Sequence, residues 1–187
     1  EITVTGEIAS EPYILLTAAL MQKAGIEVDI RLPKISIAKQ NFATNILSAG
    51  DDWTNASYWY AFVALAQSAE LILEGLEEDS AQGDKILMEW GTYFGVKSEF
   101  KNGKLHLSKF EVIEQEPLHF DFTPHPDLAQ TIIVLFAAKG IQATFTGLQS
   151  LRIKETDRIK ALQIELKKFE VELIEKQKGK FCMKING

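Results

Sequence analysis

The amino-acid sequence predicts an α/β protein in which helices and short strands alternate. Apolar residues recur at spacings of three and four, as is typical of helices, in segments that begin near residues 12, 55, 84, 127 and 155. Each segment leads toward a short strand-forming run, often directly after a glycine such as Gly25 or Gly140. Helices and strands therefore follow one another along the chain, as in α/β proteins.

Composition and charge are those of an ordinary soluble globular protein. Of the 187 residues, 46% are apolar and 25% are charged, and the formal net charge is -6. An acidic chain without a long basic run argues against a nucleic-acid partner. The longest apolar runs, such as residues 131–138, are too short to cross a membrane. Cys182 is the only cysteine, which excludes an internal disulfide and a thiolate zinc site and favours a cytoplasmic location.

The first 48 residues are expected to form a strand, a helix and two further strands. Ser10 is a good N-cap for the helix, Pro12 suits its first turn and Gly25 ends it. The other expected elements are strands at Ile2–Val4, Ile26–Leu32 and Phe42–Leu47 and an irregular link at Pro33–Asn41. The small and polar residues of Ser48–Asp52 then favour a domain boundary, with a hinge at Ala49–Asp52.

Two copies of one structural unit are expected after this boundary, over residues 50–122 and 123–187. A helix at Asn55–Ser68, capped by Thr54 or Asn55, is apolar nearly all round and is expected to be buried between layers. Asn102-Gly103 predicts a hairpin turn. The other expected elements are helices at 84–94, 127–140 and 155–169 and strands at 71–73, 96–100, 105–107, 118–122, 171–174 and 180–185.

The charged stretch within Gly147–Phe169 is expected to lie at the start of a helix. Lys154, Glu155 and Arg158 fall within one helical turn, because residues three and four apart share a face. Gly147 and Ser150 are expected to supply the preceding turn and a cap. An apolar stripe follows, which should pack on a core and comprises Ile159, Leu162, Leu166 and Phe169.

Several other polar residues have two interpretations from the sequence. Ser10 and Tyr13 are most simply a helix cap and a half-buried aromatic residue. Asp127 is either a carboxylate that stabilises a helix start or a proton-transfer group facing a cleft. His125 is a base, a surface residue or a packed one. The acidic loop Glu77–Asp79 is a metal site or, more simply, a solvated loop.

Five motifs together resemble one enzyme family. The chain contains, in this order, the strings GEIASEPYI, DDWTNASYWYAF, DSAQGD, PDLAQTI and LRIKETDRIKAL. Their order and spacing resemble the 5-enolpyruvylshikimate-3-phosphate (EPSP) synthase family, and KETDR is specific to that family. The resemblance implies transfer of the enolpyruvyl group of phosphoenolpyruvate to the 5-hydroxyl of shikimate 3-phosphate, with release of phosphate and with no metal or organic cofactor.

The resemblance also implies a fold, an inside-out α/β barrel of repeated βαβαββ units that is incomplete here. Residues 1–48 would be the last part of a first domain, on the shikimate-phosphate side. Residues 49–187 would be two units of a second domain, 50–122 and 123–187. The full-length protein is expected to be a cytoplasmic monomer whose partners are its two small-molecule substrates.

Four site residues follow from the resemblance in the last two motifs. Asp127 resembles the aspartate that hydrogen-bonds the shikimate hydroxyls and carries the 5-hydroxyl proton. Glu155 resembles the glutamate next to the enolpyruvyl carbon, a proton donor or acceptor. Lys154 resembles a lysine that contacts the shikimate side, and Arg158 the arginine at the phosphoenolpyruvate end, where glyphosate competes.

Further contacts are implied elsewhere in the chain. Ser10 and Tyr13 match contacts to shikimate 3-phosphate across the hinge, which reverses their simpler interpretation. Ser150 stands at a substrate-contact position where the family usually has asparagine. The residues Trp53–Asn55 depart from the small residues and serines of many members, near the hinge rather than the chemistry. His125 lies one position from a histidine of some relatives and is assigned no role.

Other groups of the family site have no match in these 187 residues. They are the upstream basic residues, a Ser-Ser-Gln phosphate motif and a downstream arginine and lysine. We therefore expect a central fragment with little or no activity by itself. One alternative is an enzyme like UDP-N-acetylglucosamine enolpyruvyl transferase, which uses a loop cysteine, whereas Cys182 lies in a predicted strand. Another is a non-catalytic ligand-binding module, in which Glu155 and Arg158 form only an ion pair at a solvated helix start.

Overall fold

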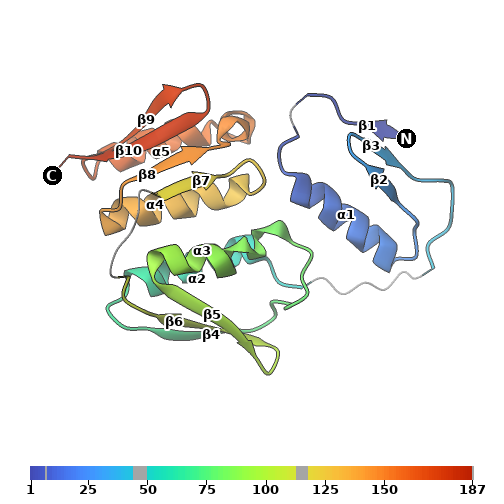
Figure 1. Ribbon diagram of the computed structural model, residues 1–187, viewed down its shortest axis with the longest axis horizontal. Helices are drawn as coiled ribbons and strands as arrows, with labels where there is room; N and C mark the ends of the chain where they lie inside the picture. The colour runs from blue at the N-terminus through green and yellow to red at the C-terminus, as the bar shows by residue number, and fades with distance from the viewer. Residues whose placement is uncertain (7, 44–49, 113–117, 187) are drawn as a thin grey trace.

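The computed structural model describes residues 1–6, 8–43, 50–112 and 118–186. Figure 1 shows three parts, each with its own sheet and helices: an N-terminal part, a central part and a C-terminal part. The elements are β1 (Ile2–Thr3), α1 (Glu11–Lys23), β2 (Asp29–Arg31), β3 (Lys34–Ser36), α2 (Trp53–Leu65), β4 (Glu70–Leu73), η1 (Gly83–Ile86), α3 (Leu87–Trp90), η2 (Gly91–Phe94), β5 (Val96–Lys101), β6 (Lys104–Lys109), β7 (Leu118–Asp121), η3 (Pro126–Leu128), α4 (Ala129–Lys139), β8 (Ala143–Thr146), η4 (Gln149–Ile153), α5 (Arg158–Lys167), β9 (Val171–Gln177) and β10 (Lys180–Ile185). The prediction of an α/β protein is confirmed.

The N-terminal part consists of α1 beside a small antiparallel sheet in the order β1-β3-β2. The predicted irregular link at 33–41 is wrong in its first residues, because Lys34–Ser36 forms β3, which pairs with β2. β3 is only three residues long and follows Pro33 directly, so a strand there is hard to distinguish from an irregular link. Of the strand predicted at 42–47, Phe42 and Ala43 are not in a strand, and residues 44–47 lie outside the described residues.

The N-terminal end of α1 also differs from the prediction. Ser10 occupies the N-cap position, but its backbone is left-handed (φ 60°, ψ 33°) and its side chain makes no capping hydrogen bond. Its N–H instead donates to the carbonyl oxygen of Thr123 at 2.9 Å. Ser10 therefore ties the start of α1 to the C-terminal part through its backbone.

The central part packs α2 on an antiparallel sheet in the order β4-β6-β5. The predicted hairpin turn is confirmed: β5 and β6 are joined at Asn102-Gly103, and both residues have positive φ, as a type I′ turn requires. The helix predicted at 84–94 is instead three short helical segments, η1, α3 and η2. Gly91 stands at the junction of α3 and η2, where glycine disfavours a continuous α-helix.

Two predictions for α2 are wrong. The helix begins at Trp53 rather than Asn55, because Asp52 is the cap and accepts the N–H of Thr54 at 2.9 Å. One face of α2 is also open to solvent instead of buried, with exposed fractions of 57% for Tyr58, 48% for Trp59, 63% for Phe62 and 50% for Leu65. The opposite face packs on the sheet and on α4. When a helix is apolar on all sides, its sequence does not show which side is covered by neighbouring elements.

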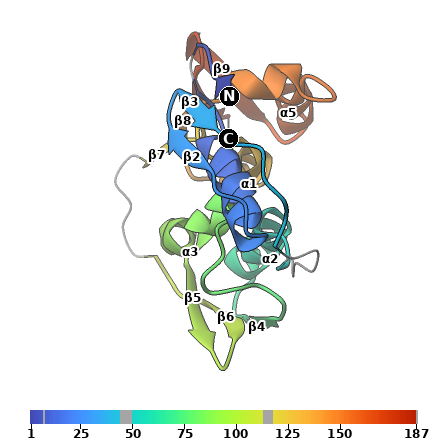
Figure 2. The same cartoon turned by 90° about the vertical axis from the view of Figure 1, so that its right-hand side faces the viewer.

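The C-terminal part has a four-stranded sheet in the order β7-β8-β10-β9, in which only the β7–β8 pair is parallel. The helices α4 and α5 pack on one another beside this sheet (Figure 1). Figure 2 shows the whole chain turned by 90°. The helix predicted from 155 begins at Arg158, because Asp157 is its cap and accepts the N–H of Lys160 at 2.9 Å. Ser150 is therefore not a cap but part of η4.

The predicted apolar stripe of α5 is confirmed at Ile159, Leu162 and Leu166, which are buried. It is wrong at Phe169, which is 75% exposed and lies beyond the end of the helix. The core runs between the central and C-terminal parts, where α2 and α4 pack against each other. Aromatic rings fill its middle: Trp90 meets Phe120 edge-on at 5.0 Å between ring centroids, and Phe120 lies 5.3 Å from Phe136.

The Phe136→Ala substitution should strongly destabilise the chain. Phe136 is fully buried among these rings, and emptying such a site lowers the free energy of unfolding by about 3–5 kcal/mol. The matched control is Phe169→Ala at the exposed site, where we expect a change within about 0.5 kcal/mol. Denaturant unfolding followed by circular dichroism measures both, and equal effects would contradict the placement of the core.

Stability should also fall at high pH because of Tyr60. Burial raises the pKa of its hydroxyl to about 12 from the usual 10, so the unfolded state loses this proton first. The free energy of unfolding should therefore fall between pH 10 and pH 12, by about 3 kcal/mol at most. In the Tyr60→Phe variant the contribution of Tyr60 should be absent, so the loss should be smaller; the remainder comes from Tyr13, whose pKa burial also raises. The matched control Tyr58→Phe leaves Tyr60 in place and should keep the pH dependence of the parent.

Candidate functional site

A hollow of about 880 Å³ opens where the three parts of the chain meet. One wall is apolar and belongs to α2 and α4, with side chains that include Phe62 and Val134. The other wall is polar and charged, and it is lined by residues such as Tyr13, Asp127 and Arg158. A pocket with an apolar wall and a few convergent polar groups is the usual form of a small-molecule site.

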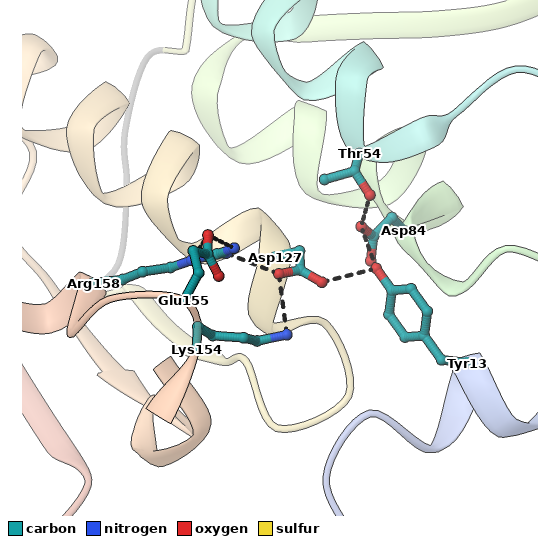
Figure 3. Close-up of polar contacts among 7 residues, drawn as sticks. All are labelled: Tyr13, Thr54, Asp84, Asp127, Lys154, Glu155 and Arg158. Carbon is teal, nitrogen blue, oxygen red and sulfur yellow. Dashed lines mark hydrogen bonds and ion pairs between the residues drawn. The ribbon is translucent and has the colours of Figure 1, made fainter. Parts of the chain in front are cut away.

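The carboxylate of Asp127 is the centre of the polar wall (Figure 3). Its Oδ1 accepts the guanidinium of Arg158 at 2.9 Å and lies 3.4 Å from the ammonium of Lys154. Its Oδ2 is 3.2 Å from the hydroxyl of Tyr13. The predicted site residues Asp127, Lys154, Arg158 and Tyr13 are thus brought together, although Tyr13 precedes Asp127 by 114 positions.

Glu155 joins this cluster through Arg158. The guanidinium donates from Nη2 to Oε1 of Glu155 at 2.6 Å and from Nε at 3.2 Å, so Arg158 bridges two carboxylates. The pKa of Glu155 is lowered, first by a hydrogen bond from its own backbone N–H and then by Arg158. Burial opposes the charge on Arg158, but its contacts with Glu155 and Asp127 outweigh burial and raise its pKa. Both groups are charged at neutral pH.

The backbone that carries these side chains explains their convergence. Lys154 and Glu155 lie in the loop between η4 and α5, and Arg158 is the first residue of α5. Lys154 has an extended backbone (φ -74°, ψ -162°), so it is not part of a helix. The expectation that all three residues share a helical turn is therefore wrong. Lys154 and Arg158 nevertheless point toward Asp127 in η3, just before α4, while Glu155 meets Arg158 (Figure 3).

The cluster combines groups with distinct chemical capacities. Lys154 and Arg158 are cations that can bind phosphate or carboxylate groups, and guanidinium does so with two parallel hydrogen bonds. Asp127 and Glu155 are carboxylates at the edge of the same hollow, suited to accept or return protons. The two positive and two negative charges balance, so an incoming anion would compete with the carboxylates for the cations.

Three further residues extend the cluster beyond the sequence-predicted set. Asp84 is completely buried, and its Oδ2 accepts the hydroxyl of Thr54 at 2.6 Å and lies 3.3 Å from that of Tyr13. His125 approaches the same carboxylate, with Nδ1 3.5 Å from Oδ1. Asp84 ends the quoted motif DSAQGD, which was the one signal available for it. Thr54, placed by its sequence outside the chemistry, lines the hollow.

Three predicted site residues, Ser10, Ser150 and Lys154, are absent from the lining of the hollow among the residues that the structure describes. Of these, Lys154 still reaches Asp127. The Oγ atom of Ser150 is buried, and no hydrogen-bond partner for it occurs in the described ranges. The side chains of Ser10 and Ser150 therefore show no contact with the Asp127 cluster in this structure.

The described residues, the acidic loop Glu77–Asp79 included, contain no group of three or more His, Cys, Asp or Glu side chains arranged to hold a metal ion. Within the same ranges, every helix is too short or too polar to span a bilayer.

Comparisons with known proteins place the chain in a family. The model of a family described as EPSP synthase (3-phosphoshikimate 1-carboxyvinyltransferase) matches residues 1–186. A 3-phosphoshikimate 1-carboxyvinyltransferase of Bacteroides fragilis is 41% identical over 169 residues, which are 90% of this chain and 41% of that protein. An enzyme of the same name from Methanospirillum hungatei is 31% identical over 166 residues, or 86% of this chain and 38% of that protein.

A solved structure, that of the enolpyruvyl transferase NikO from Streptomyces tendae, is similar at a TM-score of 0.47 and 14% identity, over 96% of this chain and 41% of that one. The chain thus spans about two-fifths of the length of the curated relatives it matches. Because the family model matches all but the last residue, the chain belongs to the EPSP synthase (3-phosphoshikimate 1-carboxyvinyltransferase) family.

Proposed function

We propose that this chain is part of a 3-phosphoshikimate 1-carboxyvinyltransferase, an enzyme of aromatic amino-acid biosynthesis. It would transfer the enolpyruvyl group of phosphoenolpyruvate to the 5-hydroxyl of shikimate 3-phosphate. The observation that carries the proposal is the contact of Asp127 with two cations, Lys154 and Arg158, and with Tyr13 at one open hollow. Family membership supports the choice of this reaction.

The reaction needs both kinds of group that the cluster contains. In the addition step, the 5-oxygen bonds to the enol carbon, the hydroxyl loses a proton and the methylene carbon gains one. In the elimination step, phosphate leaves and the methyl carbon gives up a proton. We assign Asp127 to the hydroxyl proton and Glu155 to the carbon, since both carboxylates border the hollow. Lys154 and Arg158 would hold the anionic groups and stabilise negative charge as it develops.

The proposal extends to the remaining predicted residues and to the organisation of the chain. Ser10, Tyr13 and Ser150 would contact shikimate 3-phosphate once substrate is bound. Residues 1–48 would belong to the first domain and 49–187 to two units of the second. The same connection order in β4-β6-β5 and in β8-β10-β9 supports these two units. We also propose a monomeric, cytoplasmic full-length enzyme.

The rival enolpyruvyl transferase, with UDP-N-acetylglucosamine as acceptor, is less well supported. Cys182 lies within β10, paired with Thr144 of β8 and Ile174 of β9, rather than in a loop at the hollow. A central strand of a sheet holds its side chains in fixed positions. The cysteine of this chain is therefore unsuited to the part that a loop cysteine plays in the rival family.

Phosphate release tests the proposed reaction directly. We expect the longer gene product that contains this segment to release phosphate when both substrates are supplied, and to release none with either alone. The 187-residue chain by itself should show no turnover at an ordinary enzymatic rate, because its relatives are more than twice as long. Turnover by the isolated chain would contradict the fragment hypothesis, and inactivity of the longer product would contradict the reaction.

Binding of shikimate 3-phosphate distinguishes the enzyme from a non-catalytic module. In the longer product, Lys154→Ala and Asp127→Ala should each weaken binding about tenfold or more, because each removes a charged hydrogen-bonding partner. The matched control is Lys160→Ala, which removes an exposed lysine on α5 and should leave the affinity within about twofold. Isothermal titration measures all three, and identical affinities would favour the module.

A further inference from the structure

The hydroxyl of Tyr13 lies between two carboxylates. Its oxygen is 3.2 Å from Oδ2 of Asp127 and 3.3 Å from Oδ2 of Asp84 (Figure 3). A phenol hydroxyl has a single proton and therefore donates to one of these acceptors at a time. Because the two distances are nearly equal, rotation of the O–H bond alone exchanges one acceptor for the other, and the ring need not move.

Asp84 is a rigidly held and poorly solvated acceptor. Its side chain is completely buried, and the Thr54 hydroxyl donates to its Oδ2 at 2.6 Å. Its Oδ1 and the Nδ1 of His125, 3.5 Å apart, both lack a hydrogen bond among the residues that the structure describes. The ring of Trp90 packs edge-on against His125 at 5.6 Å between centroids. A buried carboxylate with so few donors gains more from the Tyr13 proton than an exposed one would.

A close approach of the backbone brings Tyr13 to this carboxylate. A Cβ atom at Gly83 would overlap the ring of Pro12 and lie 3.2 Å from Cε1 of His125. Pro12 precedes Tyr13 in the first turn of α1, and Gly83 precedes Asp84 in η1. The missing side chain at residue 83 therefore lets the first turn of α1 reach Asp84.

We propose that Asp84 is a positioning residue for this site: by accepting the hydrogen bond of the Tyr13 hydroxyl, it frees Oδ2 of Asp127 to receive the hydroxyl proton of the substrate. The inference rests on the proposed function, since it assumes that Asp127 receives that proton. Without the Asp84 carboxylate, Asp127 is the other acceptor that the Tyr13 hydroxyl reaches in this structure, and the hydrogen bond from Tyr13 then occupies its Oδ2. Asp84 thus acts on Asp127 through Tyr13 and does not itself touch the substrate.

A double-mutant cycle in the longer gene product tests this route of action. Asp84→Asn should lower kcat about tenfold or more, while the affinity for shikimate 3-phosphate changes less than about threefold. In the Tyr13→Phe background, the same Asp84→Asn change should have little further effect on kcat, because the shared proton is gone. A purely structural role of Asp84 predicts an equal loss of kcat in both backgrounds, which would overturn the proposal.

An NMR measurement without substrate tests the hydrogen bonds of Tyr13 independently of the proposed reaction. In the 187-residue chain labelled with 13C at the tyrosine Cζ, Tyr13→Phe identifies the Tyr13 resonance. Both Asp84→Asn and Asp127→Asn should shift this resonance, and the matched control Asp79→Asn, at an exposed loop residue, should leave it in place. A shift with only one of the two carboxylate variants would show that Tyr13 is not shared and would overturn the proposal.

A second variant decides the question if Asp84→Asn does not fold. Thr54→Val keeps the Asp84 carboxylate but removes its 2.6 Å hydroxyl donor, so Asp84 should draw the Tyr13 proton more strongly. The Tyr13 resonance should then shift in the same direction as in Asp127→Asn. No shift, or the opposite one, would overturn the inference. If the parent enzyme releases no phosphate, the proposed function fails, and the resonance alone decides whether Asp84 shares Tyr13.

Discussion

The partly buried carboxylate of Asp127 makes the contacts that hold the N-terminal part against the C-terminal part. A carboxylate withdrawn from water needs cations or hydrogen-bond donors in its place. Here the donors come from separate segments: Arg158 opens α5, Lys154 precedes it, and Tyr13 belongs to α1. The contacts that stabilise the Asp127 charge therefore also hold the N-terminal part against the C-terminal part. The same residues form the candidate site and the junction between these two parts.

The elements with strong local signals could be predicted from the sequence, and those without them could not. The hairpin at Asn102-Gly103 was predictable because few residue pairs adopt two successive positive φ angles. The first residues of α2 and α5 were not, because several polar residues compete as caps and the aspartates at 52 and 157 prevailed. The exposed side of α2 was also unpredictable, since an apolar surface does not reveal which neighbours cover it.

The site divides in the same way. Asp127, Lys154, Glu155 and Arg158 could be identified because each stands in a motif that resembles a known family. Asp84 could not be assigned a role, because its partners Thr54 and Tyr13 lie 30 and 71 positions away and only the fold brings them together. Sequence motifs identify the residues that this chain has in common with its relatives. Long-range hydrogen bonds, which only the structure shows, identify the residues that position them.

The close approach at Gly83 has a consequence for the interpretation of sequence variation. Residue 83 contributes no functional group, yet a methyl group there would meet the ring of Pro12 and part α1 from η1. The rigid proline ring cannot turn aside as a long side chain would. Substitutions of Gly83 should therefore impair function as substitutions of catalytic residues do, although they remove no functional group. The cause is steric, because the backbone at residue 83 lies against the ring of Pro12.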